Sequence, residues 1–312
     1  MRRVIITWSI ALAGVVSVWL GGLSWLNHTV YSPEAVVTDY LETLEAGDVP
    51  AASALAGLER TPLVFPDADT LPSQITITGV QDTQDGRVLV RSEYQLDGNT
   101  ESSVFTLSGA PRLWGLFDQW EFSLPPTATI DTTLSGLDQV RISGAGLDHE
   151  GSLETEVLVP GYYTVDARSQ WLETEVYSTV LSEPASTWSL ELRASPTSAL
   201  LDEVHSAVAE YLGECALREV LQPSSCPFGV QLTDRLYTLP EWSISQPPAV
   251  SLEPTDDHYT WNMVALGGRA TINATVQSLF DGSLRSYEEV VAFGLTGDVT
   301  GLDTDSPALR ID

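Results

Sequence analysis

Short runs of β-branched and aromatic residues, separated by Gly, Pro and Asp, fill most of the chain after residue 74 and constrain its fold more than any other feature. Such runs predict strands, and the dipeptides Asp85-Gly86, Asp97-Gly98, Gly267-Gly268 and Asp281-Gly282 predict turns between them. Residues 127–193 show no helical periodicity, which favours a small β-sandwich there. We expect strands over residues 75–78, 87–96, 102–107, 113–122, 127–134, 139–143, 154–159, 162–168, 173–181, 187–192, 237–244, 258–266, 269–279 and 283–293.

Two segments open with a Ser-Pro pair and continue with apolar residues at helical spacing. Ser32 is a favoured N-cap residue and Pro33 suits the first helical position. Apolar residues then recur every three or four positions from Val36 to Leu44. Ser195-Pro196 opens the second segment in the same way, at an offset of 163 residues. The match leaves two interpretations open, a true duplication of one module or two unrelated amphipathic helices.

The N-terminal segment contains 23 uncharged residues, 4–26, which at helical rise is long enough to cross about 30 Å of hydrocarbon. Arg2 and Arg3 precede it, so the positive-inside rule predicts a cytoplasmic N terminus and an extracytoplasmic remainder. The run ends in bulky and polar residues, which favours an uncleaved signal anchor over the alternative, a cleaved signal peptide. We therefore expect a single-pass protein of the cell membrane.

These patterns predict an α+β fold class with an all-β middle. Leu124-Pro125-Pro126 marks the boundary between the first α+β region and the β-rich middle. The expected parts are a signal anchor or transmembrane helix over residues 1–28, an α+β domain over 33–124, a β-sandwich domain over 125–194, and a second α+β domain with an acidic C-terminal tail over 195–312.

The charged residues comprise 43 acids and 14 arginines, without lysine, and give a net charge of −29. The lack of lysine excludes Schiff bases, phosphate-loop lysines and Ser–Lys catalysis. Such a negative charge repels polyanions, so we exclude nucleic acid as a partner. The expected partners are the membrane, through the single span, and an envelope protein or cell-wall component. The sequence does not identify a small-molecule ligand.

Residues that bind metals or catalyse reactions do not cluster in the sequence. Asp256-Asp257-His258 follows a proline, where polar turn residues are expected, and no other histidine is near. Asp298, Asp303 and Asp305 do not match the twelve-residue calcium loop, so we favour an acidic tail over a calcium site. No Gly-x-Ser-x-Gly elbow or phosphate-binding loop occurs. We predict no catalytic residue, no metal site and no cofactor, with an enzyme built from carboxylates distant in sequence as an alternative.

Cys215 and Cys226 are the only cysteines, and prolines lie near the second of them. An even number of cysteines in an exported region favours a disulfide bond. In the loop-entropy model, closing a loop of this length contributes roughly 3 kcal/mol. The alternative is two buried free thiols.

The segment SPEAVVTDYLETLEAGD at residues 32–48, followed by a short helix and a meander that ends near Trp114 and Trp120, resembles NTF2-like modules of membrane-anchored or secreted Gram-positive, actinobacterial-type proteins. The likeness covers residues 33–124 and extends more weakly to 196–295. The whole layout resembles the teicoplanin-resistance-associated protein family, whose members often carry a cytoplasmic zinc ribbon. Only Met1-Arg2-Arg3 precede the apolar run here, so no such metal-dependent partner carries over. An NTF2-like fold implies a cone-shaped cavity used for catalysis, binding or packing, and no catalytic motif of the family matches.

Three functions follow from these expectations. The first is a non-enzymatic envelope protein whose acidic modules bind or position another envelope component. The second is an enzyme or small-ligand sensor that uses an NTF2-like cavity, and the third is a structural spacer. Co-purifying proteins would indicate the first, saturable ligand binding the second, and neither result the third.

Overall fold

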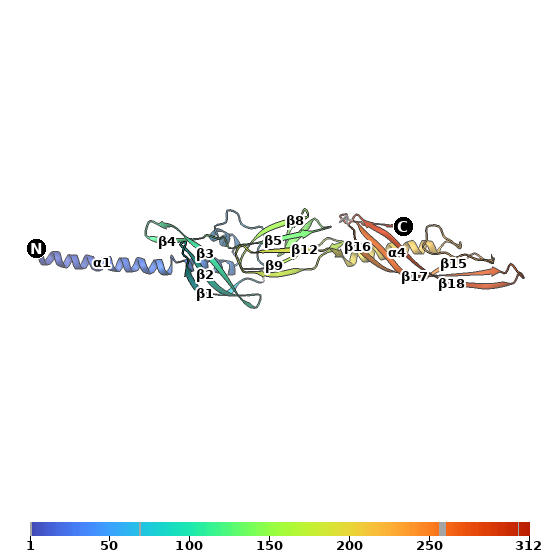
Figure 1. The fold of residues 1–312 in the computed structure, drawn as a ribbon, viewed down its shortest axis with the longest axis horizontal. Helices are drawn as coiled ribbons and strands as arrows, with labels where there is room; N and C mark the ends of the chain where they lie inside the picture. Colours follow the sequence, from blue (N-terminus) through green and yellow to red (C-terminus); the bar gives the residue numbers. More distant parts are fainter. Residues whose placement is uncertain (1, 69, 256–259, 305) are drawn as a thin grey trace. The chain divides into compact units, whose positions relative to one another are not determined.

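The computed structural model of the chain describes residues 2–68, 70–255, 260–304 and 306–312, with side chains from residue 14 onward. The chain divides into two compact units, and each unit is formed by several stretches of sequence (Figure 1). Unit 1 comprises Met1–Leu134, Asp138–Asp166 and Glu175–Leu192. Unit 2 comprises Ser135–Leu137, Ala167–Thr174 and Arg193–Asp312.

Unit 1 begins with helices and continues with an antiparallel four-stranded sheet in the order β1-β2-β3-β4. Ser32 caps the second helix, because its Oγ accepts a hydrogen bond from the Ala35 amide at 3.3 Å. Asp48 caps the third helix in the same way, through the Ala51 amide at 3.1 Å. These elements are α1 (Arg2–Thr29), α2 (Pro33–Glu45), α3 (Val49–Leu55), β1 (Ser73–Asp82), β2 (Arg87–Leu96), β3 (Asn99–Leu113) and β4 (Phe117–Phe122).

Helix α2 and the four-stranded sheet share one core. The apolar residues of α2 recur at helical spacing, so one face of the helix is buried. Strand β2 buries alternate residues, among them Val88 and Val90, and this face packs against the helix. The Tyr40 ring meets Phe105 and Phe122 edge-on, with ring centroids 5.9 and 5.3 Å away. The local sequence patterns of α2 and β2 therefore agree with their packing.

Two further sheets complete unit 1. One has the order β12-β5-β8, with β12 parallel to β5, and the other has the order β11-β9-β6-β7. Their strands are short and bury alternate residues, as in β9. The strands are β5 (Thr127–Leu134), β6 (Gln139–Ile142), β7 (Ala145–Asp148), β8 (Ser152–Leu158), β9 (Gly161–Asp166), β11 (Tyr177–Leu181) and β12 (Thr187–Leu192).

Three buried tyrosines are hydrogen-bonded in unit 1, and one of them, Tyr40, joins its helical part to these sheets. The Tyr40 hydroxyl donates to the Val159 carbonyl at 2.6 Å, and the Tyr163 hydroxyl donates to the Leu158 carbonyl at 2.6 Å. The Tyr94 hydroxyl shares a 2.6 Å hydrogen bond with Ser103. Burial raises the pKa of Tyr40 and Tyr163 well above the usual value, and it raises the pKa of Tyr94 to about 12. Residues on both sides of the Leu124-Pro125-Pro126 segment thus belong to one compact unit.

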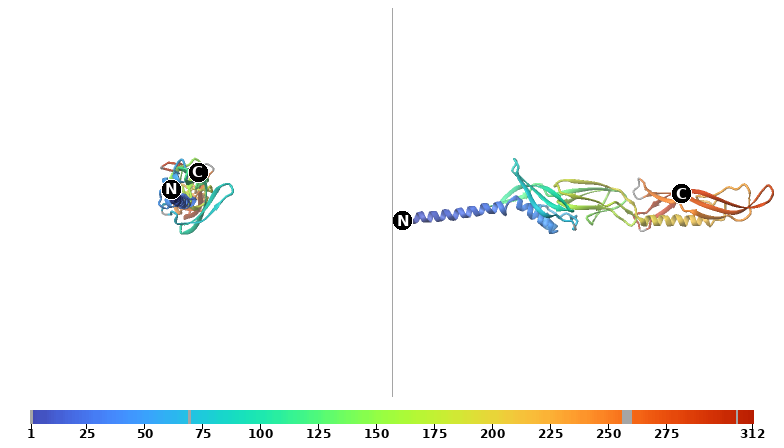
Figure 2. Two further views of the ribbon diagram at one scale, coloured as in Figure 1. Left: turned by 90° about the vertical axis from the view of Figure 1, so that its left-hand side faces the viewer. Right: turned by 90° about the horizontal axis from the view of Figure 1, so that it is seen from below.

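Unit 2 is built on a long hairpin, β17 (Trp261–Gln277) and β18 (Leu284–Thr300). Helix α4 (Ser198–Ala216) lies along this sheet in Figure 1 and in the right-hand view of Figure 2. Leu200, Val204, Val208 and Leu212 recur every four residues on α4 and form a core with β17. The remaining strands are the pair β10 (Leu172–Glu173) and β13 (Ser195–Pro196), and the sheet members β14 (Arg235–Leu236), β15 (Glu241–Gln246), β16 (Ala249–Pro254) and β19 (Ala308–Ile311).

Gly267-Gly268 forms a bulge inside β17, not the turn that the sequence predicts. The pairing with β18 shifts register between Ala265 and Gly268, and Gly267 has a positive φ of 78°. A Cβ atom at Gly268 would lie 2.5 Å from the Phe293 ring, so only glycine fits there. The two strands expected over residues 258–266 and 269–279 are therefore one strand where the structure describes them.

The predicted α+β fold class, with its NTF2-like modules, is wrong, because the structure is mostly β, with 47% of the chain in strands. The physical reason is that strands occupy much more of the sequence than helices do. In unit 2 the helical periodicity stops at the end of α4, and each strand of the main hairpin has 17 residues. The apolar helix faces near residues 36 and 200 are real, but they cover sheets that contain most of the ordered backbone.

The predicted transmembrane anchor and single-pass localisation are also wrong. Helix α1 runs from Arg2 to Thr29, yet no helix in the described part of the chain has the length and apolarity that a bilayer crossing requires. About 20 consecutive apolar residues are needed for that crossing.

Candidate functional site

The metal and catalytic motifs considered in the sequence do not form a site among the described residues. Within those ranges, no group of three His, Cys, Asp or Glu residues is placed to hold a metal ion. Asp256, Asp257, His258 and Asp305 lie outside the described residues. The carboxylate of Asp298, one of the calcium candidates, pairs with the Arg310 guanidinium at 2.5 Å.

His149 is a structural residue. It is buried, and its Nδ1 accepts a hydrogen bond from the Gly151 amide at 3.1 Å. Its Nε2 lies 3.2 Å from the Thr132 carbonyl oxygen, which can only accept. Both ring nitrogens therefore have hydrogen-bond partners inside the fold.

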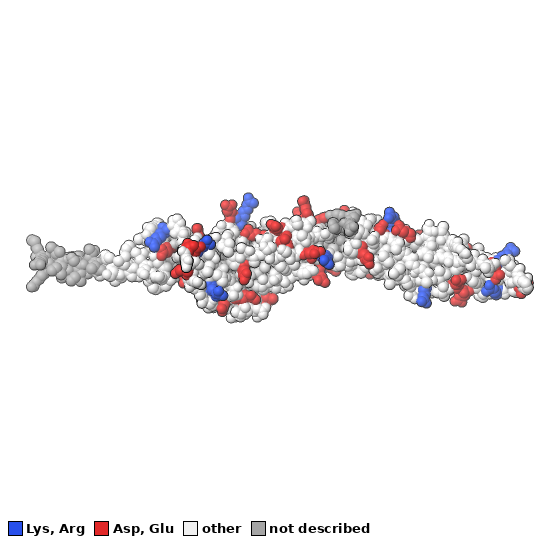
Figure 3. Space-filling model, viewed as in Figure 1, with Lys and Arg blue, Asp and Glu red and all other residues white. Residues whose placement is uncertain are grey.

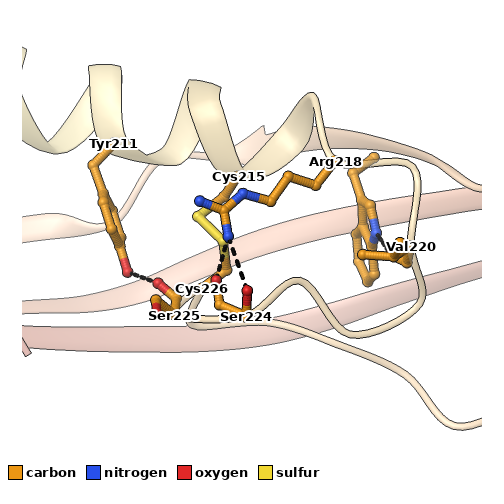
Figure 4. The surroundings of a disulfide bond; sticks show 8 residues. Tyr211, Cys215, Arg218, Val220, Ser224, Ser225 and Cys226 are labelled. Atoms are coloured by element: carbon orange, nitrogen blue, oxygen red, sulfur yellow. Dashed lines mark hydrogen bonds between the residues drawn. A yellow bond between two sulfur atoms is a disulfide. The ribbon is translucent and has the colours of Figure 1, made fainter.

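The predicted disulfide between Cys215 and Cys226 is confirmed (Figure 4). It joins the last turn of α4 to the loop that follows, with the two Cα atoms 5.8 Å apart. The Tyr211 hydroxyl donates to the Ser225 carbonyl, and the Arg218 guanidinium donates to the Ser224 carbonyl. The loop is thus held by hydrogen bonds on both sides of Cys215.

Aromatic side chains support the same loop from the core of unit 2. The Trp242 indole nitrogen donates to the Val220 carbonyl at 2.8 Å. Phe228 packs against Trp242 and Phe293, with ring centroids 4.8 and 5.5 Å away. The disulfide loop is thus a structural support at one end of α4, while its Leu217 and Val220 side chains are exposed.

The turn between β17 and β18 carries Phe280, the most exposed large apolar side chain among the described residues of unit 2. We call residues Ser278–Ser283 the hairpin tip. Phe280 is 99% exposed and Leu279 is 73% exposed. A phenylalanine in this position gains nothing from the fold of its own chain, since burial of its ring is what normally stabilises it.

Hydrogen bonds within the hairpin tip fix its shape. The Ser278 Oγ accepts from the Phe280 amide at 3.2 Å. The Asp281 carboxylate accepts from the Ser283 amide at 3.1 Å and from the Ser283 hydroxyl at 2.8 Å. These bonds from Ser283 lower the pKa of Asp281, because they favour its charged form. The tip therefore presents Leu279 and Phe280 on an ordered turn that keeps a negative charge.

Exposed apolar residues continue onto the solvent face of the sheet next to the tip. Leu284 pairs with Gln277 of β17, and Tyr237 donates its amide to the Thr275 carbonyl at 2.8 Å. Val276, between these two β17 positions, is buried, so Gln277 and Thr275 lie on the opposite, solvent-facing side. Tyr237 and Leu284 are 60% and 52% exposed. The apolar surface thus includes residues on both sides of β17, with Tyr237 after β14 and Leu284 on β18.

Charged groups surround this apolar surface. Residues 234–241 and 277–289 contain five acids and two arginines, which gives this region a net charge of −3. Arg285 pairs with Asp234 at 2.7 Å, so one arginine is already neutralised within the chain. Figure 3 shows isolated charged side chains of both signs near the right-hand end of unit 2, with uncharged surface between them. The arrangement is an apolar centre with a charged, mainly acidic border.

Unit 1 contains a separate pocket of about 370 Å³ where the end of α1 meets α2 and the sheet. Carboxylates of Glu34, Asp82 and Asp118 line it together with the Trp120 ring. Asp118 pairs with Arg112 at 2.7 Å. The volume falls in the range of small-ligand pockets, and the acidic lining would favour a cation.

Comparison with family models, with curated proteins and with solved structures finds no match for this chain. The resemblance to the teicoplanin-resistance-associated family therefore stays an untested prediction. The arguments about function rest on the geometry of the described residues.

Sequence reasoning identified the hairpin tip only as a turn. The Asp281-Gly282 dipeptide gave that prediction, and Gly282 does have a positive φ of 75°. A further signal was present in the same segment, because Leu279 and Phe280 are consecutive apolar residues inside a turn. Turns are normally polar, so an apolar pair there indicates either packing against another element or a contact surface.

Proposed function

We propose that this protein is a non-enzymatic binding protein and that the hairpin tip of unit 2 contacts a partner protein. The observation that carries the proposal is the pair Leu279 and Phe280, which are 73% and 99% exposed on an ordered turn. Burial of one such aromatic side chain contributes about 1.5–3 kcal/mol. A partner that covers the tip gains that energy.

The order of the turn supports binding in a second way. Association loses free energy when loops must be immobilised, typically about 0.5–1.5 kcal/mol for each flexible side chain. The hydrogen bonds of Ser278 and Asp281 already hold the backbone of the tip. The apolar pair can therefore enter a partner with little loss of backbone freedom. Aromatic anchors of this kind dominate the energy of many protein interfaces.

Burial and hydrogen bonding explain the shifted pKa values in the chain. The tyrosines with strongly raised pKa values in unit 1 are buried and donate to backbone carbonyls or share a bond with serine. The aspartates with lowered pKa values, Asp85 and Asp281, lie in exposed turns and accept hydrogen bonds there. Packing and turn formation account for these shifts without a chemical step.

The proposal is tested by replacing Phe280 with a photo-crosslinking phenylalanine analogue in the full chain. Because disulfides are lost under reduction, the experiment uses non-reducing extracts. We expect crosslinking to one protein species from position 280. The matched control carries the analogue at Val290, which is 53% exposed on β18 but outside the tip. Equal crosslinking from both positions would refute a specific contact at the tip.

A second candidate function is small-ligand binding in the unit 1 pocket, and its volume of about 370 Å³ favours it. Titration calorimetry with small organic amines tests this candidate. Saturable binding that Trp120→Ala abolishes would support it, since aromatic faces attract cations. Binding that is unchanged by this substitution would place the ligand elsewhere.

A further inference from the structure

The border of the hairpin tip indicates what kind of protein surface fits it. This inference rests on the proposed function, because it concerns the partner at the same tip. Asp281 lies directly beside Phe280 in the sequence and is held in the turn by Ser283. Glu288 and Glu289 are exposed on β18, a few residues after the tip. Any surface that receives Phe280 must also accommodate the neighbouring Asp281 carboxylate.

Charge excludes several occupants of the tip. A second copy of the chain carries the same net charge of −29 and the same acidic border, so the two tips would repel each other. A bilayer of anionic lipids repels the acids for the same reason. A partner with a neutral rim would desolvate the charged Asp281 carboxylate with only the hydrogen bonds from Ser283 as compensation, which is unfavourable. Complementarity therefore requires positive charge around an apolar cleft.

We infer that the hairpin tip docks into an apolar cleft of a partner protein whose rim carries lysine or arginine side chains. Phe280 and Leu279 occupy the cleft, and Asp281 faces the rim. Arg285 does not oppose this arrangement, since Asp234 already pairs with it at 2.7 Å. The apolar pair supplies affinity, while the acids supply orientation and a faster encounter.

The experiment starts from the protein crosslinked at position 280, which is identified, purified and titrated with the full chain. Phe280→Ser should weaken binding at least about 100-fold, as for an interface hot spot. The triple change Asp281→Asn, Glu288→Gln and Glu289→Gln should weaken it about tenfold and flatten its dependence on salt. The mapped crosslink should lie in an apolar cleft next to at least two basic residues. Val290→Ser is the matched control and should bind as the unaltered chain does.

The outcomes separate the inference from the proposed function. If Phe280→Ser abolishes binding but the triple change and added salt have no effect, the tip binds a protein and the basic rim is wrong. If Phe280→Ser binds as tightly as Val290→Ser, the proposed function itself fails. Two further experiments test other occupants of the tip. Sedimentation with phosphatidylcholine vesicles tests a lipid surface, and sedimentation equilibrium of the chain alone tests a second copy. A Phe280-dependent result in either experiment would overturn the inference in favour of a lipid surface or a second copy.

Discussion

Two hairpin turns of this protein carry aromatic residues, and they use them differently. In the β3–β4 turn of unit 1, Phe117 packs on Tyr31, with ring centroids 4.7 Å apart. Asn27 of α1 donates to the Leu116 carbonyl at 3.2 Å, which joins the helix to this turn. In the β17–β18 turn of unit 2, Phe280 is 99% exposed, and the bonds that hold the turn come from its own residues.

The comparison shows that an aromatic residue at a turn does not by itself indicate a binding site. In unit 1 the ring of Phe117 is half-buried because Tyr31, in the segment between α1 and α2, packs against it. Trp114 of the same turn remains 82% exposed, yet it also lies edge-on to Phe117 at 6.4 Å. Phe280 is different because it is almost completely exposed at the end of its hairpin. Contact with a second element is therefore the criterion that separates a packing turn from a candidate binding turn.

The largest expected difference between the two units is their response to alkaline pH. The folded-state pKa values of Tyr40, Tyr94 and Tyr163 are raised, and that of Tyr94 reaches about 12. Stability from these neutral hydroxyls is fully present below pH 10, the ordinary tyrosine pKa, and is lost as the pH rises above it. We expect unit 1 to unfold first between about pH 10 and 12, measured by hydrogen exchange resolved to peptides.

The alkaline experiment has a direct control in Tyr40→Phe. This change removes one titrating hydroxyl, so the alkaline midpoint of unit 1 should move to higher pH, although its stability at neutral pH falls with the lost bond to Val159. Unfolding of unit 2 before unit 1 as the pH rises would contradict the prediction that the buried tyrosines set the alkaline limit of unit 1.

Removal of the disulfide should lower the stability of unit 2, which carries the hairpin tip, and should leave the stability of unit 1 unchanged. The double change Cys215→Ser and Cys226→Ser should lower the free energy of unfolding of unit 2 by roughly 3 kcal/mol. Denaturant titration followed by peptide-resolved hydrogen exchange measures the effect for each unit. An equal loss in unit 1 would mean that the two units do not unfold separately.

Truncation of the two phenylalanines tests the comparison of the turns directly. Phe117→Ala removes a half-buried ring and should lower the stability of unit 1 by about 1–2 kcal/mol. Phe280→Ala removes an exposed ring and should change the stability of unit 2 by less than about 0.5 kcal/mol. Thermal unfolding of both variants gives the values. A destabilised Phe280→Ala chain would show that the tip has a packing role.

The smallest expected effect concerns the link between α1 and the β3–β4 turn. Asn27→Ala removes the bonds to the Leu116 carbonyl at 3.2 Å and from the Asp118 amide at 3.4 Å. We expect faster amide exchange at Asp118 and a loss of about 0.5–1 kcal/mol, because these bonds are exposed. Ser24→Ala, on the same helix, is the control and should leave the exchange at Asp118 unchanged.

Local signals in the sequence located several elements accurately. The run 87–96 predicted β2 with its observed ends, because apolar residues alternate there and turn dipeptides lie on both sides. The Ser-Pro pair at residue 32 predicted the start of α2, since the cap and the first helical position are local properties. The pairing of Cys215 with Cys226 needed only their number and spacing.

Features that depend on distant contacts escaped the sequence patterns. Gly267-Gly268 has the composition of a turn, but Phe293 on the opposite strand occupies the space beside Gly268 and makes a bulge. The predicted fold class was wrong for a related reason. The helix patterns near residues 36 and 200 do not indicate how large a sheet each helix covers. The candidate site was missed because the exposure of the Phe280 side chain depends on the fold of the chain and cannot be read from the residue type.

The hydrogen bonds that fix the β17–β18 turn all join residues between Gln277 and Ser283, including the 3.2 Å bond from the Gln277 side chain to the Gly282 carbonyl. The geometry of the turn is thus encoded in a segment short enough to synthesise. A cyclic peptide of this span should keep the pose of Leu279 and Phe280 and compete with the whole protein for its partner. We therefore expect the proposed recognition element to retain its shape when it is grafted onto another β-hairpin without the remainder of unit 2.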